Sequence, residues 1–398
     1  MKLGPKLRKK STELHEFIRK ASVFIDYFLW LLLDPSKYTI IKTNKIKKIL
    51  VVLVNPEMGN VGGDFCALGV VNYFKKVYPS VNVSFLLDKK TKSHFGEIPG
   101  IEMIEHKGRR ALDILKKNAP DAALFISLGP FKLKDFLFVK YRVVTFYPSI
   151  RGLLVYKNKL HITRKPFTLW GTHMVEFGFK MFESLGFKFP RKDVIIYYSK
   201  KEENKVDNFL KKKRIKKYIV MHPGGKHVVK TLKGGKWPPH LWPVDRYAKV
   251  ANHFSKKGYN ILVTGTKEES YLAEKIQEKT KSKIYDVCGL FSIRELAPLL
   301  KKSELLIATD TSIVHIAYQV KAKIVELFGP SYAKAVGAWP LNSKRHKILI
   351  DGGPCARSMR KIFCPENIVC LDRISVREVI DSSEKLLDIS FKKTSFLG

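Results

Sequence analysis

Acidic residues are scarce in this sequence relative to basic ones. Its 398 residues include 36 Asp and Glu against 74 Lys and Arg, which gives a formal net charge of +38 at pH 7. Such an excess favours a negatively charged partner, through a long-range attraction that salt weakens. The sequence contains no recognisable nucleic-acid-binding module, so we expect an anionic membrane surface or an anionic substrate as partner, and no nucleic acid.

Cysteine is also scarce. Five cysteines, an odd number in a long chain without a recognisable secretory signal, argue against a disulfide scaffold and for a reducing, cytoplasmic compartment. Cys355, Cys364 and Cys370 lie in one basic loop, but their spacing matches no standard zinc pattern. Two interpretations stay open for this loop: a metal clip completed by His346 or Cys288, or free thiols in a packed loop.

Long apolar runs are missing as well, because no stretch approaches the ~18 apolar residues that span a bilayer. The longest, residues 21–33, contains Asp26 and follows several Lys and Arg residues. It differs from a signal peptide because it runs into Asp34-Pro35 rather than into small residues. Within a basic N-terminal segment, residues 1–45, it is either an amphipathic helix on a membrane surface or a helix packed on the protein.

What the sequence does contain is a regular alternation of strand and helix patterns. In residues 46–195, short runs rich in Val, Leu and Ile alternate with helical segments, which indicates a doubly wound α/β domain. The strand patterns cover residues 47–55, 81–87, 122–127 and 142–146. A loop with three glycines, residues 56–63, leads to Asp64 and a helical run over 65–78. Asp64 is therefore either the N-cap of that helix or a general base at the end of the first strand.

Residues 218–375 repeat this alternation after a basic linker at 196–217. The expected elements are a strand at 218–222 that ends in Pro223-Gly224-Gly225, a helix from Val244 to Gly258, a strand at 260–264, a helix at 268–279 and a helix from the capping box at 292–295 to Lys302. Pro298 is awkward inside the last of these helices. A helix and tail, residues 376–398, end the chain. The sequence thus predicts two doubly wound, Rossmann-like domains facing a central cleft.

The stretch from Asp310 to His315 lies between apolar runs at 305–308 and 323–328. This pattern predicts strand, helix and parallel strand, so residues 309–312 fall at the carboxyl end of a strand, where a helix begins. Ligands of α/β sheets bind at that edge, and a helix N-terminus offers N–H groups to phosphate. The stretch is therefore a phosphate-binding candidate.

Taken in order, these segments resemble glycosyltransferase family 9, the ADP-heptose heptosyltransferases of lipopolysaccharide core assembly. The resemblance covers roughly residues 47–380. The motifs that carry it are Gly63-Asp64, Trp237-Pro238 before a helix, Asp310-Thr311-Ser312-Ile313-Val314-His315-Ile316-Ala317, Phe328-Gly329-Pro330 and the cysteine-bearing loop at 355–370. The resemblance implies a GT-B fold and an inverting, metal-independent transfer from a nucleotide sugar, with no cofactor besides that donor.

The resemblance also implies roles for single residues. Asp64 matches the family's general base, Asp310 the residue that holds hydroxyls of the donor sugar, and Glu269 an acidic position that binds ribose. The remaining donor-binding positions are Thr311, Ser312, His315, Lys236, Gly224 and Gly225. Alternatives remain for three of these residues: Asp310 as another N-cap, His315 as a core histidine and Glu269 as a surface helix residue.

Two positions depart from the family's pattern. Ser312 replaces the Gly of the central motif, and Gly235 replaces a Lys two positions before the Trp. Lys236 or Lys233 would then supply the charge for the diphosphate from a shifted position, and Lys226 and Lys230 are further candidates. We expect a monomeric enzyme, peripheral to the inner face of the cytoplasmic membrane, that moves heptose from ADP-heptose to a lipid-linked or lipopolysaccharide-core glycan. The alternatives are a nucleotide-sugar epimerase or hydrolase on the same fold, and a non-catalytic protein that binds membranes or polyanions.

Overall fold

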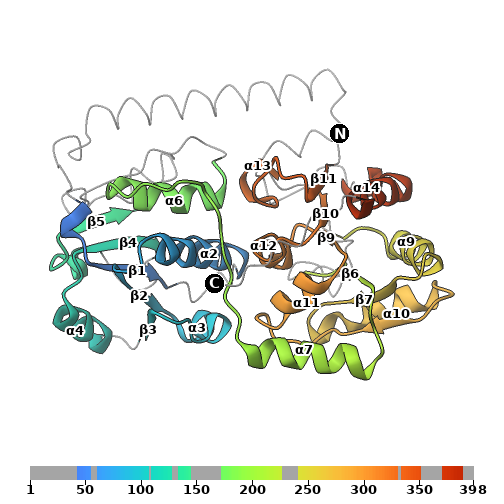
Figure 1. The fold of residues 1–398 in the computed structure, drawn as a ribbon, viewed down its shortest axis with the longest axis horizontal. Helices are drawn as coiled ribbons and strands as arrows, with labels where there is room; N and C mark the ends of the chain where they lie inside the picture. Colours follow the sequence, from blue (N-terminus) through green and yellow to red (C-terminus); the bar gives the residue numbers. More distant parts are fainter. Residues whose placement is uncertain are drawn as a thin grey trace, which may run out of the picture. The chain divides into compact units, whose positions relative to one another are not determined.

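A computed structural model describes residues 43–54, 61–106, 109–127, 133–144, 172–225, 241–329, 333–350 and 370–388. Contacts along the chain divide it into two compact units, Met1–Val194 and Ile195–Gly398. Each unit is built on its own parallel sheet with helices on both faces (Figure 1). The α/β class expected from the sequence is confirmed.

The first unit contains a five-stranded sheet in the order β3-β2-β1-β4-β5, with every pair parallel. Its strands are β1 (Lys48–Leu53), β2 (Asn82–Leu87), β3 (Ile101–Glu105), β4 (Ala122–Ser127) and β5 (Tyr141–Val144). Its helices are η2 (Thr43–Lys45), α2 (Val61–Val77), α3 (Lys89–Phe95), α4 (Arg109–Asn118), η3 (Leu133–Phe136) and α6 (Met174–Ser184). The four expected strands are present within two residues of their predicted ends.

The two faces of this sheet are covered by different helices. Leu50 and Val52 of β1 pack with Leu115 of α4 in one cluster, whereas Phe85 of β2 points to the opposite face and contacts Phe95 of α3. Successive side chains of a strand point to opposite faces, which explains why the central strands are apolar throughout. On the α2 side, α6 stacks its aromatic rings on those of α2, with 4.2 Å between the ring centroids of Phe74 and Phe182.

The second unit contains a six-stranded parallel sheet in the order β11-β10-β9-β6-β7-β8. Its strands are β6 (Tyr218–His222), β7 (Asn260–Val263), β8 (Ile284–Asp286), β9 (Leu305–Thr309), β10 (Ile324–Phe328) and β11 (His346–Ile350). Its helices are α7 (Lys200–Lys212), α9 (Val244–Lys256), η5 (Lys267–Glu269), α10 (Ser270–Glu278), α11 (Leu296–Lys302), α12 (Ser312–Gln319), α13 (Ala333–Val336), η7 (Cys370–Arg373) and α14 (Val376–Asp388). As expected, Gly258 ends α9 with a positive φ of 82°.

The helix predicted from the capping box at 292–295 begins later than expected. Ser292 and Glu295 do form the two reciprocal hydrogen bonds of a capping box, but the α-helix starts at Leu296. Pro298 therefore lies in the first turn, where a backbone N–H would have no partner within the helix and its loss costs little. The expected awkwardness of Pro298 does not arise.

The basic segment after residue 195 contains α7, which is fixed to α11 by ion pairs. Glu202 of α7 receives two contacts from Arg294, one from Nε to Oε1 at 2.6 Å and one from Nη2 to Oε2 at 3.0 Å. Lys205 pairs with Glu295 at 2.8 Å. A two-pronged contact between Arg and a carboxylate is geometrically specific, so α7 packs as part of the second unit.

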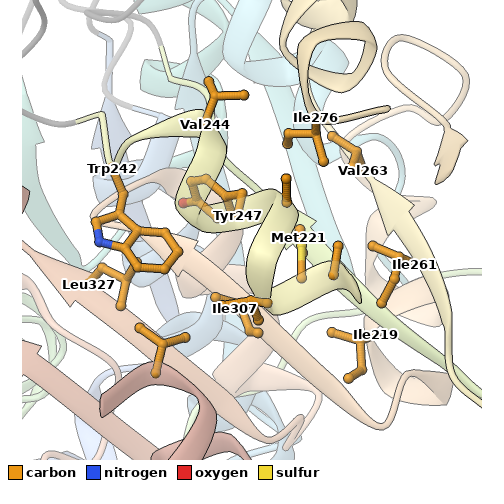
Figure 2. Close-up of a cluster of buried hydrophobic side chains, with 14 of the residues drawn as sticks. Ile219, Met221, Trp242, Val244, Tyr247, Ile261, Val263, Ile276, Ile307 and Leu327 are labelled. Carbon is orange, nitrogen blue, oxygen red and sulfur yellow. The ribbon is translucent and has the colours of Figure 1, made fainter. Parts of the chain in front are cut away.

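The core of the second unit lies between the sheet and the layer of α9, α10 and α14. Figure 2 shows Trp242 and Tyr247 beside Leu327, with Met221 and Ile307 of the neighbouring strands next to them. The Trp242 indole N–H donates to the carbonyl oxygen of Ile374 at 2.9 Å. This bond fastens the segment before α14 to the start of α9.

None of the helices in the described residues combines the length and the apolar character needed to cross a bilayer. Residues 21–33, for which the sequence left a membrane-surface helix and a packed helix open, lie outside the described residues.

We expect Trp242→Ala to destabilise the second unit by about 3–5 kcal/mol, because it removes a fully buried indole together with its hydrogen bond. Urea unfolding followed by circular dichroism measures this loss. The matched variant Phe74→Ala, also fully buried, acts on the first unit. If the two units unfold in separate transitions, Trp242→Ala shifts the transition of the second unit and Phe74→Ala that of the first. Equal shifts of both transitions by both variants would contradict the division of the chain into two units.

Candidate functional site

Three strand ends of the second unit meet at one edge of its sheet. β6 pairs in parallel with both β7 and β9, so the loops after these strands leave from the same edge. These loops carry the Gly224-Gly225 turn, Glu269 and the stretch from Asp310 to Ser312. The structure thus brings these six predicted positions from distant parts of the chain to one edge, as the topology of a parallel sheet requires.

Glu269 is the centre of this cluster. It follows β7, and only 3% of its surface is exposed. One carboxylate oxygen accepts a hydrogen bond from the backbone N–H of Gly225, and the other accepts one from the backbone N–H of Thr266 at 2.7 Å. The interpretation of Glu269 as a surface helix residue is therefore wrong: the side chain turns inward and ties the loop after β6 to the loop after β7.

The two glycines are needed because this loop passes close to its neighbours. A Cβ atom on Gly224 would lie 2.4 Å from a carboxylate oxygen of Glu269, which two backbone bonds hold in place. A Cβ atom on Gly225 would lie 3.1 Å from the side-chain methyl of Thr311. Any larger residue at position 224 would push the Glu269 carboxylate out of position.

His222 belongs to this cluster, although no sequence pattern had pointed to it. It ends β6, and its Nδ1 lies 3.0 Å from the Thr264 hydroxyl. Burial lowers the pKa of His222, while the nearby Glu269 carboxylate acts in the opposite direction. The imidazole is therefore neutral at pH 7. A histidine at the end of a buried strand, directly before Pro-Gly-Gly, is the signal that could have found it.

The helix that follows β9 has an open N-terminus. α12 begins at Ser312, and its N-cap is Thr311, whose backbone is extended (φ −144°, ψ 165°). The Thr311 side chain accepts no capping hydrogen bond from the helix, and its hydroxyl donates to the Thr309 carbonyl oxygen at 3.2 Å. The alternative that Asp310 is the N-cap is wrong, since Asp310 precedes Thr311. The Thr311 side chain therefore leaves the first N–H groups of the helix to other acceptors, and an anion is one such acceptor.

His315 lies one turn into α12 and is 5% exposed. Its Nδ1 is 3.4 Å from the Tyr318 hydroxyl, and its carbonyl oxygen accepts a hydrogen bond from Gln319. These contacts within the helix fit the interpretation as a core histidine. A donor-binding role for His315 stays a prediction.

A buried carboxyl group that was not predicted from the sequence lies on the next strand. Glu326 of β10 is fully buried, and one of its oxygens accepts a hydrogen bond from the Ala338 N–H at 2.9 Å. Among the described residues, its other oxygen has no hydrogen-bond partner. Burial, followed by the nearby charge of Asp310, raises the pKa of Glu326 well above its ordinary value. A lone Glu inside the apolar run at 324–328 was the available signal.

In the first unit, Asp64 lies in the first turn of α2. The N-cap alternative is wrong, because the helix already begins at Val61, and Gly62 and Gly63 belong to it. Only 7% of Asp64 is exposed, and burial raises the pKa of its carboxyl to about 7, with a further contribution from the negative charge of Asp88. A buried acid whose pKa is near neutrality is typical of a general acid or base.

Several predicted positions lie outside the described residues. They are Lys236, the Trp237-Pro238 pair, Cys355 and Cys364, and the side chain of Cys370 is not described either. In the described part of the chain, the Trp-Pro pair directly before α9 is Trp242-Pro243, with Pro243 at the N-cap. Within the described ranges, no three or more His, Cys, Asp or Glu side chains are grouped so that they could hold a metal ion.

Comparison with known proteins decides the family. The sequence pattern of "Glycosyltransferase family 9 (heptosyltransferase)" matches residues 149–363, more than half of the chain. The chain belongs to glycosyltransferase family 9. It is therefore a glycosyltransferase, and the resemblance stated from the sequence is confirmed.

Relatives and solved structures of this family agree with that assignment. Lipopolysaccharide heptosyltransferase 3 of Escherichia coli (strain K12) is 25% identical over 334 residues, covering 80% of this chain and 93% of the relative. A family 9 glycosyltransferase from Veillonella parvula superposes with a TM-score of 0.67 at 19% identity, covering 87% of this chain and 99% of that one. The structure of E. coli ADP-heptose lipopolysaccharide heptosyltransferase II superposes with a TM-score of 0.63 at 15% identity, covering 85% of this chain and 98% of that one. The family 9 member described here thus has the GT-B fold expected from the sequence.

We expect Glu269→Gln to destabilise the protein by roughly 1–3 kcal/mol. The two oxygens of Glu269 each accept a hydrogen bond from one backbone N–H, whereas an amide has only one acceptor oxygen, so one of the two N–H groups would lose its partner. Urea unfolding measures the loss. Glu268→Gln, at an exposed neighbouring position, is the matched control and should stay within about 0.5 kcal/mol of the unmodified protein. Equal stabilities of the two variants would show that Glu269 does not hold this loop.

Glu326 should make the stability of the protein depend on pH. The pKa of Glu326 is raised in the folded state, so at pH values above the ordinary pKa of a carboxyl group the folded state binds more protons than the unfolded chain. The contribution of Glu326 to the free energy of unfolding is therefore fully present at low pH and is lost as the pH rises. Glu326→Gln, measured by urea unfolding at several pH values, should gain stability relative to the unmodified protein as pH increases, whereas the exposed Glu274→Gln should keep the original pH dependence.

Proposed function

We propose that this enzyme transfers heptose from ADP-heptose to a lipopolysaccharide-core acceptor, with inversion at the anomeric carbon and without a metal ion. Membership of a heptosyltransferase family and the similarity to lipopolysaccharide heptosyltransferase 3 of E. coli support heptose as the sugar. The shared fold with the ADP-heptose heptosyltransferase II of E. coli supports ADP-heptose as the donor. The observation that carries the donor half of the proposal is the convergence of Glu269, the Gly224-Gly225 turn and the N-terminus of α12 at one sheet edge.

On the donor side, each part of this cluster suits one part of a nucleotide sugar. The Glu269 carboxylate accepts two backbone N–H groups and has further lone pairs for the ribose hydroxyls. The uncapped first turn of α12, from Thr311 to Ile313, offers N–H groups and a positive dipole end to the diphosphate. As the sugar leaves, negative charge grows on the diphosphate, and these fixed donors stabilise it. Lys236 would add a positive charge, and Asp310 would hold hydroxyls of the sugar.

On the acceptor side, Asp64 is the proposed base. Its carboxylate takes the proton of the acceptor hydroxyl while that oxygen forms a bond to the anomeric carbon on the side opposite the departing diphosphate. The diphosphate leaves with the electron pair of the broken bond, so the configuration inverts. A pKa of about 7 suits this step, because the group is substantially ionised at neutral pH and still has a high affinity for a proton.

The acceptor and the location follow from charge. A formal net charge of +38 favours a phosphorylated, lipid-linked core and an anionic membrane surface. We therefore propose that the enzyme acts at the inner face of the cytoplasmic membrane, where such acceptors would be reached from the cytoplasm. That it acts as a monomer is a separate part of the proposal, which the charge does not address.

Donor binding is tested first, by thermal unfolding of the purified chain with ADP-heptose and, in parallel, with UDP-sugars. A ligand at a hundred times its dissociation constant stabilises the folded state by about 2.7 kcal/mol, which raises the melting temperature. We expect ADP-heptose to stabilise the unmodified protein and Asp64→Asn alike, and Asp310→Asn less.

Transfer is then measured with lipopolysaccharide cores that lack heptose. We expect Asp64→Asn to lower kcat about 10²- to 10⁴-fold with donor binding intact, and the kcat/KM of the unmodified enzyme to fall below a pH of about 7. Inversion is read from the anomeric configuration of the product by NMR. Transfer by Asp64→Asn at the unmodified rate would refute the base, and no transfer to any core would refute the proposed reaction.

A further inference from the structure

The strands of the second sheet all begin at one side of the sheet, which we call the amino edge. Every pair of neighbouring strands is parallel, so the starts of the strands lie next to each other. Backbone hydrogen bonds join these starts: the Asn260 N–H donates to the carbonyl oxygen of Lys217 at 2.9 Å. The Ile324 N–H donates in the same way to Arg345, also at 2.9 Å. The amino edge is therefore one continuous surface.

Basic residues lie shortly before each of these strands. They are Lys216 and Lys217 before β6, Lys256 and Lys257 before β7, Lys281 and Lys283 before β8, Lys301 and Lys302 before β9, Lys321 and Lys323 before β10, and Lys344 and Arg345 before β11. Most of them are exposed; Lys302, Lys323 and Arg345 are half-buried. The acidic residue in these segments is Glu304. The amino edge is strongly positive along its whole length.

The opposite edge of the same sheet has the reverse charge. Asp286 ends β8, and in the described residues the segments after the strands contain Glu268, Glu269 and Asp310 against one lysine, Lys267. An even spread of the chain's excess charge would make both edges basic. The basic residues of this sheet are instead segregated to the amino edge.

Several charges of the amino edge are not used within the protein. Lys257 pairs with Glu384 of α14, and Lys302 pairs with Asp207 of α7. Among the described residues, the exposed lysines of this edge that form no ion pair include Lys216, Lys256, Lys281 and Lys344. Such charges attract anions outside the protein.

The preference of helix C-termini for lysine does not explain this distribution. The helix dipole favours a lysine in the last turn, and Lys256 at the end of α9 is such a case. The dipole effect falls off beyond that turn. Lys216, Lys281 and Lys344 lie after the preceding helix has ended, so their positions require another reason.

The dimensions and chemistry of the amino edge fit an extended anionic surface. Neighbouring strands lie 4.7–4.9 Å apart, so the row of strand starts is about 24 Å wide. Lys217 Nζ lies 4.0 Å from the centre of the Tyr259 ring, and Lys283 Nζ lies 5.0 Å from that of Tyr285. One face of each ring is thereby closed to a nucleic-acid base, which disfavours single-stranded nucleic acid. A bilayer with anionic phospholipids offers charge over such an area.

We propose that the amino edge of the second sheet is the surface with which this enzyme lies on an anionic phospholipid bilayer. The inference rests on the membrane location proposed above and adds the face of the protein that meets the lipid. The edge with Glu269 then points away from the bilayer. β9 has 5 residues, which at about 3.3 Å per residue sets the proposed donor site roughly 16 Å beyond the amino edge. That height suits a glycan acceptor that extends from the membrane.

Binding of the full-length protein to lipid vesicles tests this surface. The vesicles consist of phosphatidylcholine alone or with about one-third phosphatidylglycerol, in about 0.15 M salt. We expect the unmodified protein to bind the anionic vesicles much more tightly, and less tightly as salt is added. The triple variant Lys216→Gln, Lys281→Gln, Lys344→Gln should bind them about 100-fold more weakly, at about fivefold per charge.

A matched variant removes the same charge elsewhere on the second unit. Lys249→Gln, Lys267→Gln and Lys334→Gln change exposed residues of α9, η5 and α13. Its affinity for the vesicles should stay within about twofold, because charges more than ~8 Å from the lipid are screened at this salt concentration. Urea unfolding should give both triple variants the midpoint of the unmodified protein, since all six substitutions are at exposed positions.

Chemical modification locates the contact surface on the unmodified protein. Lysines are acetylated with an N-hydroxysuccinimide ester, with and without anionic vesicles, and the modified peptides are measured by mass spectrometry. We expect vesicles to protect Lys216, Lys281 and Lys344, and to leave Lys249 and Lys334 as reactive as before.

The outcomes separate this inference from the proposed reaction. Equal loss of vesicle binding in the two triple variants, or no loss in the first, would show that the amino edge is not the lipid-binding surface. Binding of a short RNA or DNA through the same three lysines, without binding to vesicles, would assign the edge to nucleic acid and overturn the inference. Transfer to soluble, delipidated cores tests the reaction independently: its absence, together with the expected vesicle binding, would refute the reaction and leave the surface in place.

Discussion

The sheet edge of the second unit at which we propose the donor to bind depends on one buried carboxyl group, that of Glu269. Glu269 reaches from the loop after β7 to the backbone of Gly225 after β6 and to Thr266 in its own loop. Backbone N–H groups that are buried without a partner are costly, so a side chain with two acceptor oxygens at this place fixes two loops at once. The absence of a side chain at Gly224 allows this approach, and Gly225 lets Thr311 come close from the third strand. Three segments that lie far apart in the sequence are thereby held at one edge.

Burial, more than pairing, sets the protonation of the groups at both candidate sites. Removal from water is the largest cause of the raised pKa of Asp64, of the raised pKa of Glu326 and of the lowered pKa of His222. Desolvation disfavours the charged form of every group, so acids bind protons more tightly and the histidine loses its proton. The chain carries a large excess of positive charge, yet burial shifts His222 and Glu326 toward their neutral forms. The long-range attraction for an anionic partner and the local proton chemistry are thus controlled by different parts of the molecule.

Sequence reasoning succeeded where a pattern is local and failed where packing overrides it. The strands of the first unit follow from runs of Val, Leu and Ile, but β3 (Ile101–Glu105) was missed, because an edge strand alternates exposed and buried residues and forms no apolar run. The start of α2 was misplaced because Gly62 and Gly63 are typical of loops, whereas this buried helix includes them. Propensity is a weak guide wherever tertiary packing supplies more free energy than the local preference.

The sequence by itself determined the α/β class, the strand-to-helix junction at Asp310–Ser312, the family and the excess of basic residues, because each depends on residue types at fixed spacing. Only the tertiary structure decided that Thr311 and not Asp310 caps α12, and that Glu269 turns inward to the Gly225 backbone. Only the tertiary structure left the side chains of Asp64 and Glu326 buried. The physical reason is that burial and hydrogen bonding depend on which strands and helices become neighbours, and contacts between residues so far apart in the chain leave no periodic signal in the sequence.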